Sequence, residues 1–169
     1  PAQLMGGFSS EIPIIQLVTG PMLTGSYNGE RVGACTDCRR FWASYRAEEI
    51  NLDEINKVNN QLVPTVGTCG VMGTASTMAI LTEALGLMIP SGACAPAVSS
   101  ERRRIAEKTG IESVRIANLK HIPKKYITLK NFENALITLS AIGGSTNGLV
   151  HLTAIAGRLG YKIDLKKFD

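Results

Sequence analysis

The sequence lacks any apolar run close to the roughly 18 residues that a membrane-spanning helix needs. Its first residues, Pro1-Ala-Gln-Leu4, are not a charged leader followed by an apolar stretch. It also has no internal repeat and no low-complexity tract. These absences argue against a membrane protein, a signal peptide and a repeat array. We therefore expect a cytoplasmic protein, or one of an organelle matrix if the source is eukaryotic.

Aromatic residues are few, at 5%, and most basic residues are scattered. The formal net charge is +4 and the sequence pI is about 9.0. The only dense basic spots are Arg102-Arg-Arg104 and Lys166-Lys167, without aromatic residues between them. A nucleic-acid interface needs a basic stripe together with a reading motif, so we predict no nucleic-acid partner. Arg102–Arg104 is interpreted as a solvated helix face or a subunit contact.

Cysteines in the pattern of a disulfide framework are also absent. Four cysteines stand at irregular spacing in a chain that we expect to have no leader: Cys35, Cys38, Cys69 and Cys94. This usage indicates a reducing compartment.

The Cys35-Thr-Asp-Cys38 segment leaves three interpretations open, of which a structural or substrate-adjacent loop is favoured. A redox pair would follow an apolar strand, whereas the preceding Gly25–Arg31 is polar and turn-like. A zinc site would also use Cys69 and Cys94, but structural zinc sites usually combine two close doublets.

With 169 residues, 44% of them hydrophobic and 19% charged, the chain can form one domain core. The β-rich run Ile12–Val18 predicts a strand, and Val114–Ala117 is either a strand or the continuation of a helix. Apolar spacing and capping residues predict helices over 37–45, 51–62, 76–85, 99–109, 128–139 and 145–159, with a capping box of Asn51 and Glu54. Periodicity alone thus predicts a helix-rich α/β domain.

The segment Gly67-Thr-Cys-Gly-Val-Met-Gly-Thr-Ala-Ser-Thr-Met78 places a cysteine in a glycine-rich turn that opens a helix. The glycines allow tight backbone conformations, and Thr74, Ser76 and Thr77 are capping residues. Free N–H groups at a helix start favour a thiolate at Cys69. This arrangement suits a metal ligand, a reactive thiol or an anion site, and a small buried thiol beside a tight turn is an equal alternative.

A second glycine turn, Gly143-Gly-Ser-Thr-Asn147, also precedes a helix. Its backbone N–H groups can hold a carboxylate or phosphate. A plain helix–helix turn capped by Ser145 explains the pattern equally well. His151 is interpreted as an ordinary helix residue and His121 as part of a loop.

Three segments, in order along the whole chain, resemble the dihydroxy-acid and sugar-acid (aldonate, 6-phosphogluconate) dehydratase family. Gly67–Met78 with Glu83–Gly86 and Pro90 is similar to the segment that carries the family's third cluster cysteine. Pro1–Gly6 resembles the end of its first signature, which contains a Cys-Asp-Lys run. Phe132–Ala135 with Ile142–Asn147 and His151-Leu152 resembles its Gly-Gly-Ser-Thr-Asn helix start.

The resemblance implies an α/β fold with a short parallel sheet flanked by helices. Because family members are several times longer, it also implies that residues 1–169 are a single partial domain. They would be an internal fragment of the N-terminal cluster-binding domain, with the C-terminal domain absent. The parent is expected to form a homodimer or homotetramer, to act on a small hydroxy acid and to have no membrane partner.

The resemblance further implies an iron–sulfur cluster, 2Fe-2S rather than 4Fe-4S, and Mg²⁺. The family's functional residues are three cluster cysteines, a metal-binding lysine, metal-binding carboxylates and a serine base. Of these, only one cluster cysteine has a counterpart in this chain, and that counterpart is Cys69. The expected reaction is hydro-lyase conversion of a 2,3-dihydroxy acid or sugar acid to a 2-keto-3-deoxy acid, and the fragment alone is expected to be inactive. The residues expected beside the substrate or cluster are Thr74, Gly144, Ser145, Thr146 and Asn147.

Two choices stay open from the sequence. The Cys35–Cys38 segment, Gly73 and Ser76 look more like the sugar-acid branch of the family than the branched-chain amino-acid branch, so a sugar acid is slightly favoured. The rival from another class is a non-catalytic zinc- or thiol-based binding module that would use Cys35, Cys38, Cys69 and Cys94.

Overall fold

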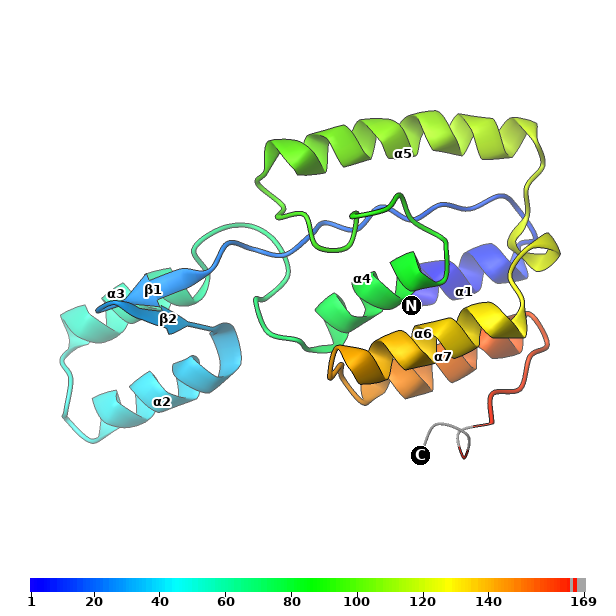
Figure 1. The fold of residues 1–169 in the computed structure, drawn as a ribbon. Coiled ribbons are helices and arrows are strands. Elements are labelled where there is room, and N and C mark those ends of the chain that lie inside the picture. The colour runs from blue at the N-terminus through cyan, green and yellow to red at the C-terminus, as the bar shows by residue number, and fades with distance from the viewer. Residues whose placement is uncertain (165, 167–169) are drawn as a thin grey trace.

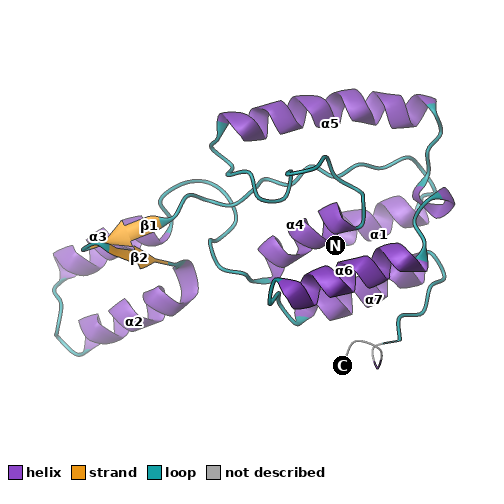
Figure 2. Cartoon of the chain, in the orientation of Figure 1, coloured by secondary structure: helices purple, strands orange, loops and turns teal. Residues whose placement is uncertain are grey.

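The computed structural model describes residues 1–164 and residue 166, with the side chain of Ala34 excepted. Lys167, half of the second basic spot, lies outside the described residues. Figures 1 and 2 show helices joined by long irregular segments, with one small pair of strands. The elements in order are α1 (Ala2–Ser9), β1 (Gly25–Tyr27), β2 (Glu30–Val32), α2 (Ala34–Arg46), α3 (Leu52–Leu62), α4 (Thr74–Ala84), α5 (Ser100–Asn118), a 3₁₀ turn (Pro123–Lys125), α6 (Leu129–Ala141) and α7 (Asn147–Arg158).

The larger core is formed by α1, α4, α6 and α7, which lie side by side in the right half of Figure 1. Each of these helices contributes one apolar face to it. The side chains that are wholly or almost wholly buried in it include Phe8, Leu81, Leu85, Phe132, Leu136, Leu152 and Ile155. This core fixes the direction of α4, the helix that follows the Cys69 turn.

A second, smaller core belongs to residues 25–62, which we call the hairpin unit. In it, β1 and β2 pair antiparallel and pack with α2 and α3 at the left of Figure 1. Asn28 and Gly29 have φ of 49° and 80°, the conformation that a two-residue hairpin turn needs. The unit buries Val32, Ile55, Val58 and Leu62 against partly buried aromatic side chains.

Several local predictions are confirmed. Asn51 caps α3, with the Glu54 N–H donating to its Oδ1 at 3.0 Å and the Asn51 N–H donating to Glu54 Oε2 at 2.9 Å. α6 follows Thr128 directly, and the Thr128 N–H donates to Asn131 Oδ1 at 2.9 Å. α7 ends just before Gly160, whose φ is +80°.

The predicted end of α5 is wrong. We expected the helix that begins at Ser99 to end at Thr109, before Gly110, but α5 continues to Asn118. It includes Val114–Ala117, for which continuation of a helix was one of the two alternatives. Unlike Gly86 and Gly160, Gly110 does not have a positive φ. A glycine ends a helix efficiently only where the chain turns into the left-handed region.

The helix-rich α/β prediction is confirmed, but its parallel sheet needs correction. Within the described residues the only sheet is the antiparallel hairpin of β1 and β2. The predicted strand Ile12–Val18 is irregular backbone that has one ladder-like bond, from the Gln16 N–H to the Leu87 carbonyl at 2.7 Å. In the part of the chain that the structure describes, parallel pairing occurs at a single bridge between Pro21 and Thr68. A β-rich segment becomes a strand only where a neighbour pairs along its length.

Across the part of the chain that the structure describes, no helix is both long enough and apolar enough to pass through a bilayer.

Candidate functional site at the Cys69 turn

Cys69 follows the point where two distant segments meet in parallel. The Met22 N–H donates to the Thr68 carbonyl, and the Thr68 N–H donates to the Gly20 carbonyl, both at 2.9 Å. Gly67 has a φ of +133°, and a Cβ there would lie 2.4 Å from Met22 N. A glycine is therefore required for this close approach.

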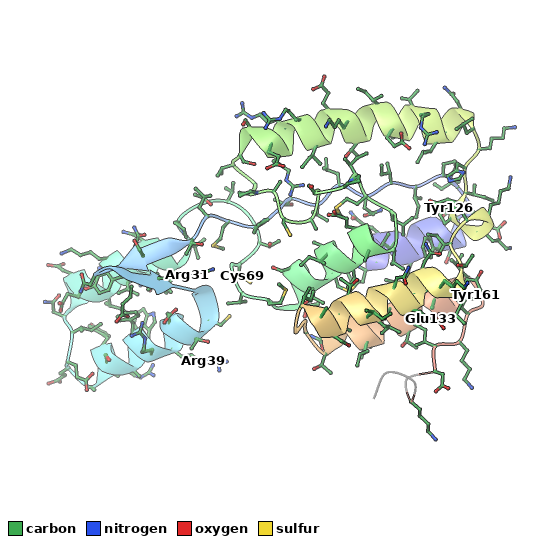
Figure 3. All side chains as sticks on the ribbon, viewed as in Figure 1. Arg31, Arg39, Cys69, Tyr126, Glu133 and Tyr161 are labelled. Carbon is green, nitrogen blue, oxygen red and sulfur yellow. The ribbon has the colours of Figure 1, made fainter. Side chains whose placement is uncertain are left out.

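The Cys69 turn, residues 69–73, carries a partly exposed thiol and free backbone donors. Among the described residues, none of its five N–H groups donates a hydrogen bond to the protein. Its Val71 carbonyl accepts a bond from Ser76 Oγ at 3.1 Å. Figure 3 shows Cys69 in the stretch between the hairpin unit and α4. The turn thus presents one thiol with unpaired N–H groups beside it.

The predicted capping roles in this segment need correction. Gly73 is the N-cap of α4, and no side chain caps the helix. The Thr74 and Thr77 hydroxyls instead contact the Gly143–Asn147 turn. Asn147 Nδ2 donates to Thr74 Oγ1 at 2.9 Å, and the Ser145 N–H donates to Thr77 Oγ1 at 2.9 Å.

The structure brings most of the predicted site-adjacent residues together at the start of α4. Thr74 Oγ1 lies 3.4 Å from Ser145 Oγ. Gly144 packs so closely that an added Cβ would lie 2.6 Å from Leu139 Cδ1 and 3.0 Å from Thr77 Cγ2. Thr146 is the N-cap of α7 but makes no capping bond through its side chain. The starts of α4 and α7 are therefore fixed to each other next to the Cys69 turn.

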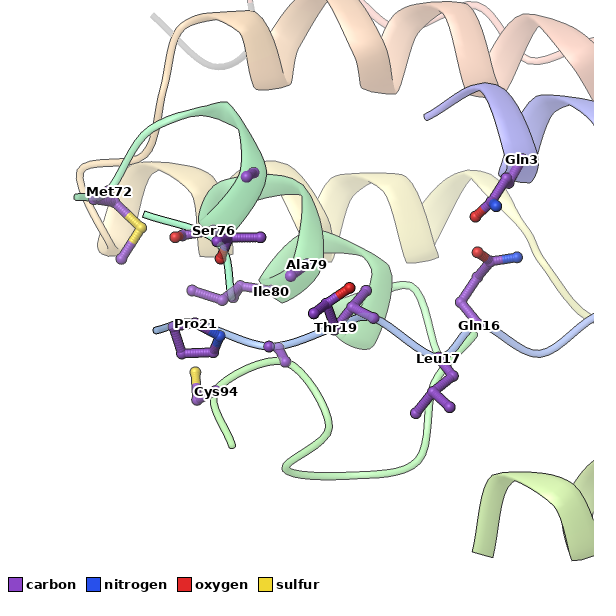
Figure 4. Close-up of a pocket in the computed structure, with 15 residues that line it drawn as sticks. Gln3, Gln16, Leu17, Thr19, Pro21, Met72, Ser76, Ala79, Ile80 and Cys94 are labelled. Atoms are coloured by element: carbon purple, nitrogen blue, oxygen red, sulfur yellow. The ribbon is translucent and has the colours of Figure 1, made fainter. Parts of the chain in front are cut away.

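A cavity of about 480 Å³ opens beside this turn, between α4 and the segment 16–21 (Figure 4). Met72 and Ser76 stand at one end of it, and Gln3 and Gln16 stand at the other. Thr68, which precedes Cys69, also lines it. Its size is within the range of small-molecule sites.

The other cysteines do not join Cys69 in a metal site. Gly33, the N-cap of α2, lies near the Cys69 turn, since a Cβ added to it would lie 3.7 Å from Val71 Cγ1. Cys35 is exposed there, whereas Cys38 packs against the core of the hairpin unit. Cys94 is an exposed residue on the wall of the cavity. Over the described residues, which include all four cysteines, no three His, Cys, Asp or Glu side chains are placed to hold a metal. The four-cysteine zinc site that the spacing left open is not formed.

Asp37 stabilises the start of α2. The Gly33 N–H donates to its Oδ2 at 2.6 Å, and this bond, with help from the Arg40 guanidinium, holds the pKa of Asp37 below its usual value. Negative charge in the first turn of a helix is favourable, so Asp37 has a structural role in the Cys35–Cys38 segment.

Sequence reasoning missed Arg102, Gln3 and Gln16. Arg102 was interpreted as solvated or interfacial, yet it is only 7% exposed. Its guanidinium donates to the Val18 carbonyl at 2.9 Å and to the Ala95 carbonyl at 2.5 Å. Burial lowers the pKa of Arg102. Its burial could have been predicted from its helical spacing, which places it on the same face of α5 as the buried Ile105 and Thr109. No signal in the sequence singled out the two glutamines.

Comparison with known proteins gives consistent results. The sequence profile of the family described as "Dihydroxy-acid/6-phosphogluconate dehydratase N-terminal" matches residues 1–169. The chain is 41% identical over its full length to an L-arabinonate dehydratase of Rhizobium leguminosarum. It is 37% and 35% identical, again over its full length, to dihydroxy-acid dehydratases of Thermodesulfovibrio yellowstonii and Metallosphaera sedula. It spans 29%, 31% and 30% of the lengths of these three relatives, respectively.

Proposed function

Because this chain belongs to the dihydroxy-acid/6-phosphogluconate dehydratase family, we propose that the complete protein is a hydro-lyase acting on 2,3-dihydroxy acids. The reaction removes the proton from C2 and hydroxide from C3, which together leave as water. The resulting enol takes up a proton at C3 as its C2 hydroxyl becomes a ketone. The product is a 2-keto-3-deoxy acid.

We propose Cys69 as one thiolate ligand of an iron–sulfur cluster, 2Fe-2S in preference to 4Fe-4S. Cys69 is partly exposed, has no disulfide partner and lies beside unpaired N–H groups that can donate to cluster sulfurs. These features fit one cluster ligand, and we propose that the remaining ligands belong to the rest of the complete protein, because no three His, Cys, Asp or Glu side chains of the described residues are placed to hold a metal. Such a cluster supplies a Lewis-acidic iron that assists departure of the C3 hydroxyl.

The residues of this chain support that chemistry by holding the turn in place. Ser76 Oγ fixes the Val71 carbonyl, and the bonds from Asn147 and Ser145 fix the first turns of α4. The turn can then present its thiol and N–H groups with little reorganisation. The described residues offer no matching set of carboxylates for Mg²⁺, so we assign no residue of this chain to that ion.

Among the 2,3-dihydroxy acids, we favour a sugar acid over a branched-chain acid. The L-arabinonate dehydratase relative is 41% identical to the chain, whereas the two dihydroxy-acid dehydratases are 37% and 35% identical. Gly73 and Ser76, which the sequence analysis associated with the sugar-acid branch, both lie at the start of α4. Ser76 lines the cavity.

The observation that carries the proposal is the free thiol of Cys69 at the parallel junction of Pro21 and Thr68. In the complete protein, Cys69→Ser should abolish both the cluster absorbance and dehydratase activity. Cys94→Ser is the matched control, because Cys94 is also a free cysteine near the cavity, and it should keep both. A Cys69→Ser protein that retains its cluster would falsify the assignment.

A further inference from the structure

Arg102 is a buried cation that makes no ion pair within the described residues. The residue is only 7% exposed, and the ion pairs found in that part of the chain do not include its guanidinium. Its buried Nε–H also has no hydrogen-bond partner there. Burial of a charge is costly unless hydrogen bonds replace those lost to water. What this side chain contributes is therefore to be found in the bonds that it does make, to two backbone carbonyls.

These bonds connect segments that are far apart in the sequence. Arg102 Nη1 donates to the Val18 carbonyl at 2.9 Å, and Nη2 donates to the Ala95 carbonyl at 2.5 Å. The Ala97 N–H donates to the Pro21 carbonyl at 2.9 Å and joins the same two segments again. One guanidinium thus connects the first turn of α5 to both of them.

Gly20 packs directly against this guanidinium. Its φ is +88°, and an added Cβ would lie 2.5 Å from Arg102 Nη2, 2.9 Å from Nε and in collision with the Ala95 carbonyl oxygen. Only a glycine leaves room for the buried side chain at this point. The guanidinium therefore fixes the position of Gly20, whose carbonyl accepts the Thr68 N–H at 2.9 Å.

Regular strand pairing does not hold this segment in place. The backbone of residues 12–18 is irregular, and within the described residues the only parallel pairing is the bridge between Pro21 and Thr68. In a continuous sheet, the N–H of a neighbouring strand would donate to a carbonyl such as that of Val18. Here the guanidinium is the donor, so the junction that precedes Cys69 depends on a side chain from α5.

We propose that Arg102 is a positioning residue for the Cys69 turn. It holds Val18 through a hydrogen bond and Gly20 through packing. Gly20 in turn fixes Thr68, the residue directly before Cys69. Arg102 does not line the cavity, and it acts through this backbone. The inference rests on the proposed function for its consequence, because the position of the turn affects the reaction only if the Cys69 thiolate binds the cluster.

The test is amide hydrogen exchange of the complete protein, measured by mass spectrometry of its peptides. Arg102→Met removes both hydrogen bonds and keeps an unbranched side chain. Peptides that contain the Thr68 and Met22 N–H groups, which bond across the junction, should then exchange about tenfold faster, as expected for the loss of one or two buried hydrogen bonds. Peptides of α6, in the larger core, should keep their exchange rate. A residue that only stabilised the whole fold would change both.

Arg103→Met is the matched control, because Arg103 is the exposed neighbour of Arg102 on α5, and it should leave exchange at the junction unchanged. Arg102→Lys keeps a charged donor and should accelerate the same exchange by a smaller factor. It carries the test if Arg102→Met does not fold. After reconstitution with iron and sulfide, Arg102→Met should also lose its cluster absorbance to a chelator several-fold faster than Arg103→Met does.

The proposal is overturned if exchange at the junction is unchanged in the Arg102 variants, or if it rises equally in α6. It is also overturned if the variants lose the cluster no faster than the unaltered protein. These outcomes are separable from failure of the proposed function, because hydrogen exchange is measured without a cluster. Faster exchange confined to the junction, in a protein that binds no cluster, would support the role of Arg102 and contradict the proposed function.

Discussion

The backbone N–H of Ser145 donates a hydrogen bond to Thr77 Oγ1 at 2.9 Å, joining two turns that are far apart in the sequence. Thr77 is fully buried in α4, one helical turn beyond Thr74. Its hydroxyl does not cap its own helix but satisfies a donor of the Gly143–Asn147 turn. The second glycine turn is therefore part of the support of the Cys69 turn and more than a connection between α6 and α7.

We expect Thr77→Val to lower the free energy of unfolding by about 1–3 kcal/mol, because it leaves the Ser145 N–H without its partner at a part-buried position. Urea unfolding followed by circular dichroism measures the change. Thr77→Ser keeps the oxygen and should recover part of the loss. Thr153→Val removes an exposed hydroxyl of α7 and should change the free energy by less than about 0.5 kcal/mol. Equal effects of Thr77→Val and Thr153→Val would contradict this role for Thr77.

Gly144→Ala should destabilise the same junction. Its Cβ would lie 2.6 Å from Leu139 Cδ1 and 3.0 Å from Thr77 Cγ2, closer than side chains pack. Relief of these contacts should cost about 1–3 kcal/mol of unfolding free energy. The matched control is Gly110→Ala in α5, where an added Cβ meets nothing within 4 Å.

Because alanine is the better helix former, the Gly110→Ala control should stabilise the protein by about 0.5–1 kcal/mol. The two substitutions should therefore shift the melting temperature in opposite directions. A rise in melting temperature for both variants would mean that the crowding at Gly144 is relieved without cost.

The sequence predicted the helix caps and helix ends that depend on contacts between residues close together in the chain. The Asn51 cap, the helix that follows Thr128 and the stop before Gly160 involve contacts within a few residues, and all three are confirmed. The helix end predicted before Gly110 was wrong because glycine marks a helix end only with a positive φ, which Gly110 does not have. Ile12–Val18 has strand-forming residues, but pairing depends on a neighbouring segment that the local pattern cannot reveal.

The candidate site depends more on distant contacts. Cys69 could be identified from its glycine turn and the family resemblance. The Thr77–Ser145 bond joins residues in separate helical segments, and Gln3 and Gln16 face each other only because α1 and the segment 16–21 meet across the cavity. Arg102 looked solvated within a run of three arginines, yet its side chain reaches the Val18 and Ala95 carbonyls. No sequence pattern shows such contacts.

We predict that Cys35 and Cys38 are neither cluster ligands nor a redox pair. In the complete protein, changing both to serine should leave the iron content unchanged and weaken substrate binding modestly, because Gly33, at the start of α2, lies near Val71 of the Cys69 turn. Cys38→Ser should account for any loss of stability, since Cys38 packs against the core of the hairpin unit and Cys35 is exposed. Iron analysis tests whether the two cysteines are cluster ligands, and thiol titration tests whether they form a redox pair. Loss of iron in the double variant would overturn this interpretation.

The 169-residue chain on its own should show no dehydratase activity, even after anaerobic reconstitution with iron, sulfide and Mg²⁺. Metal affinity depends on a set of ligands held together by the fold, and no three suitable side chains of the described residues are so placed. A cluster held by Cys69 alone would be exposed to solvent and quickly lost. The assay is keto-acid formation from a five-carbon aldonate and from a branched-chain dihydroxy acid, with the complete protein reconstituted in parallel as the positive control. Turnover by the chain above that of its Cys69→Ser variant would show that a second catalytic set lies within these residues.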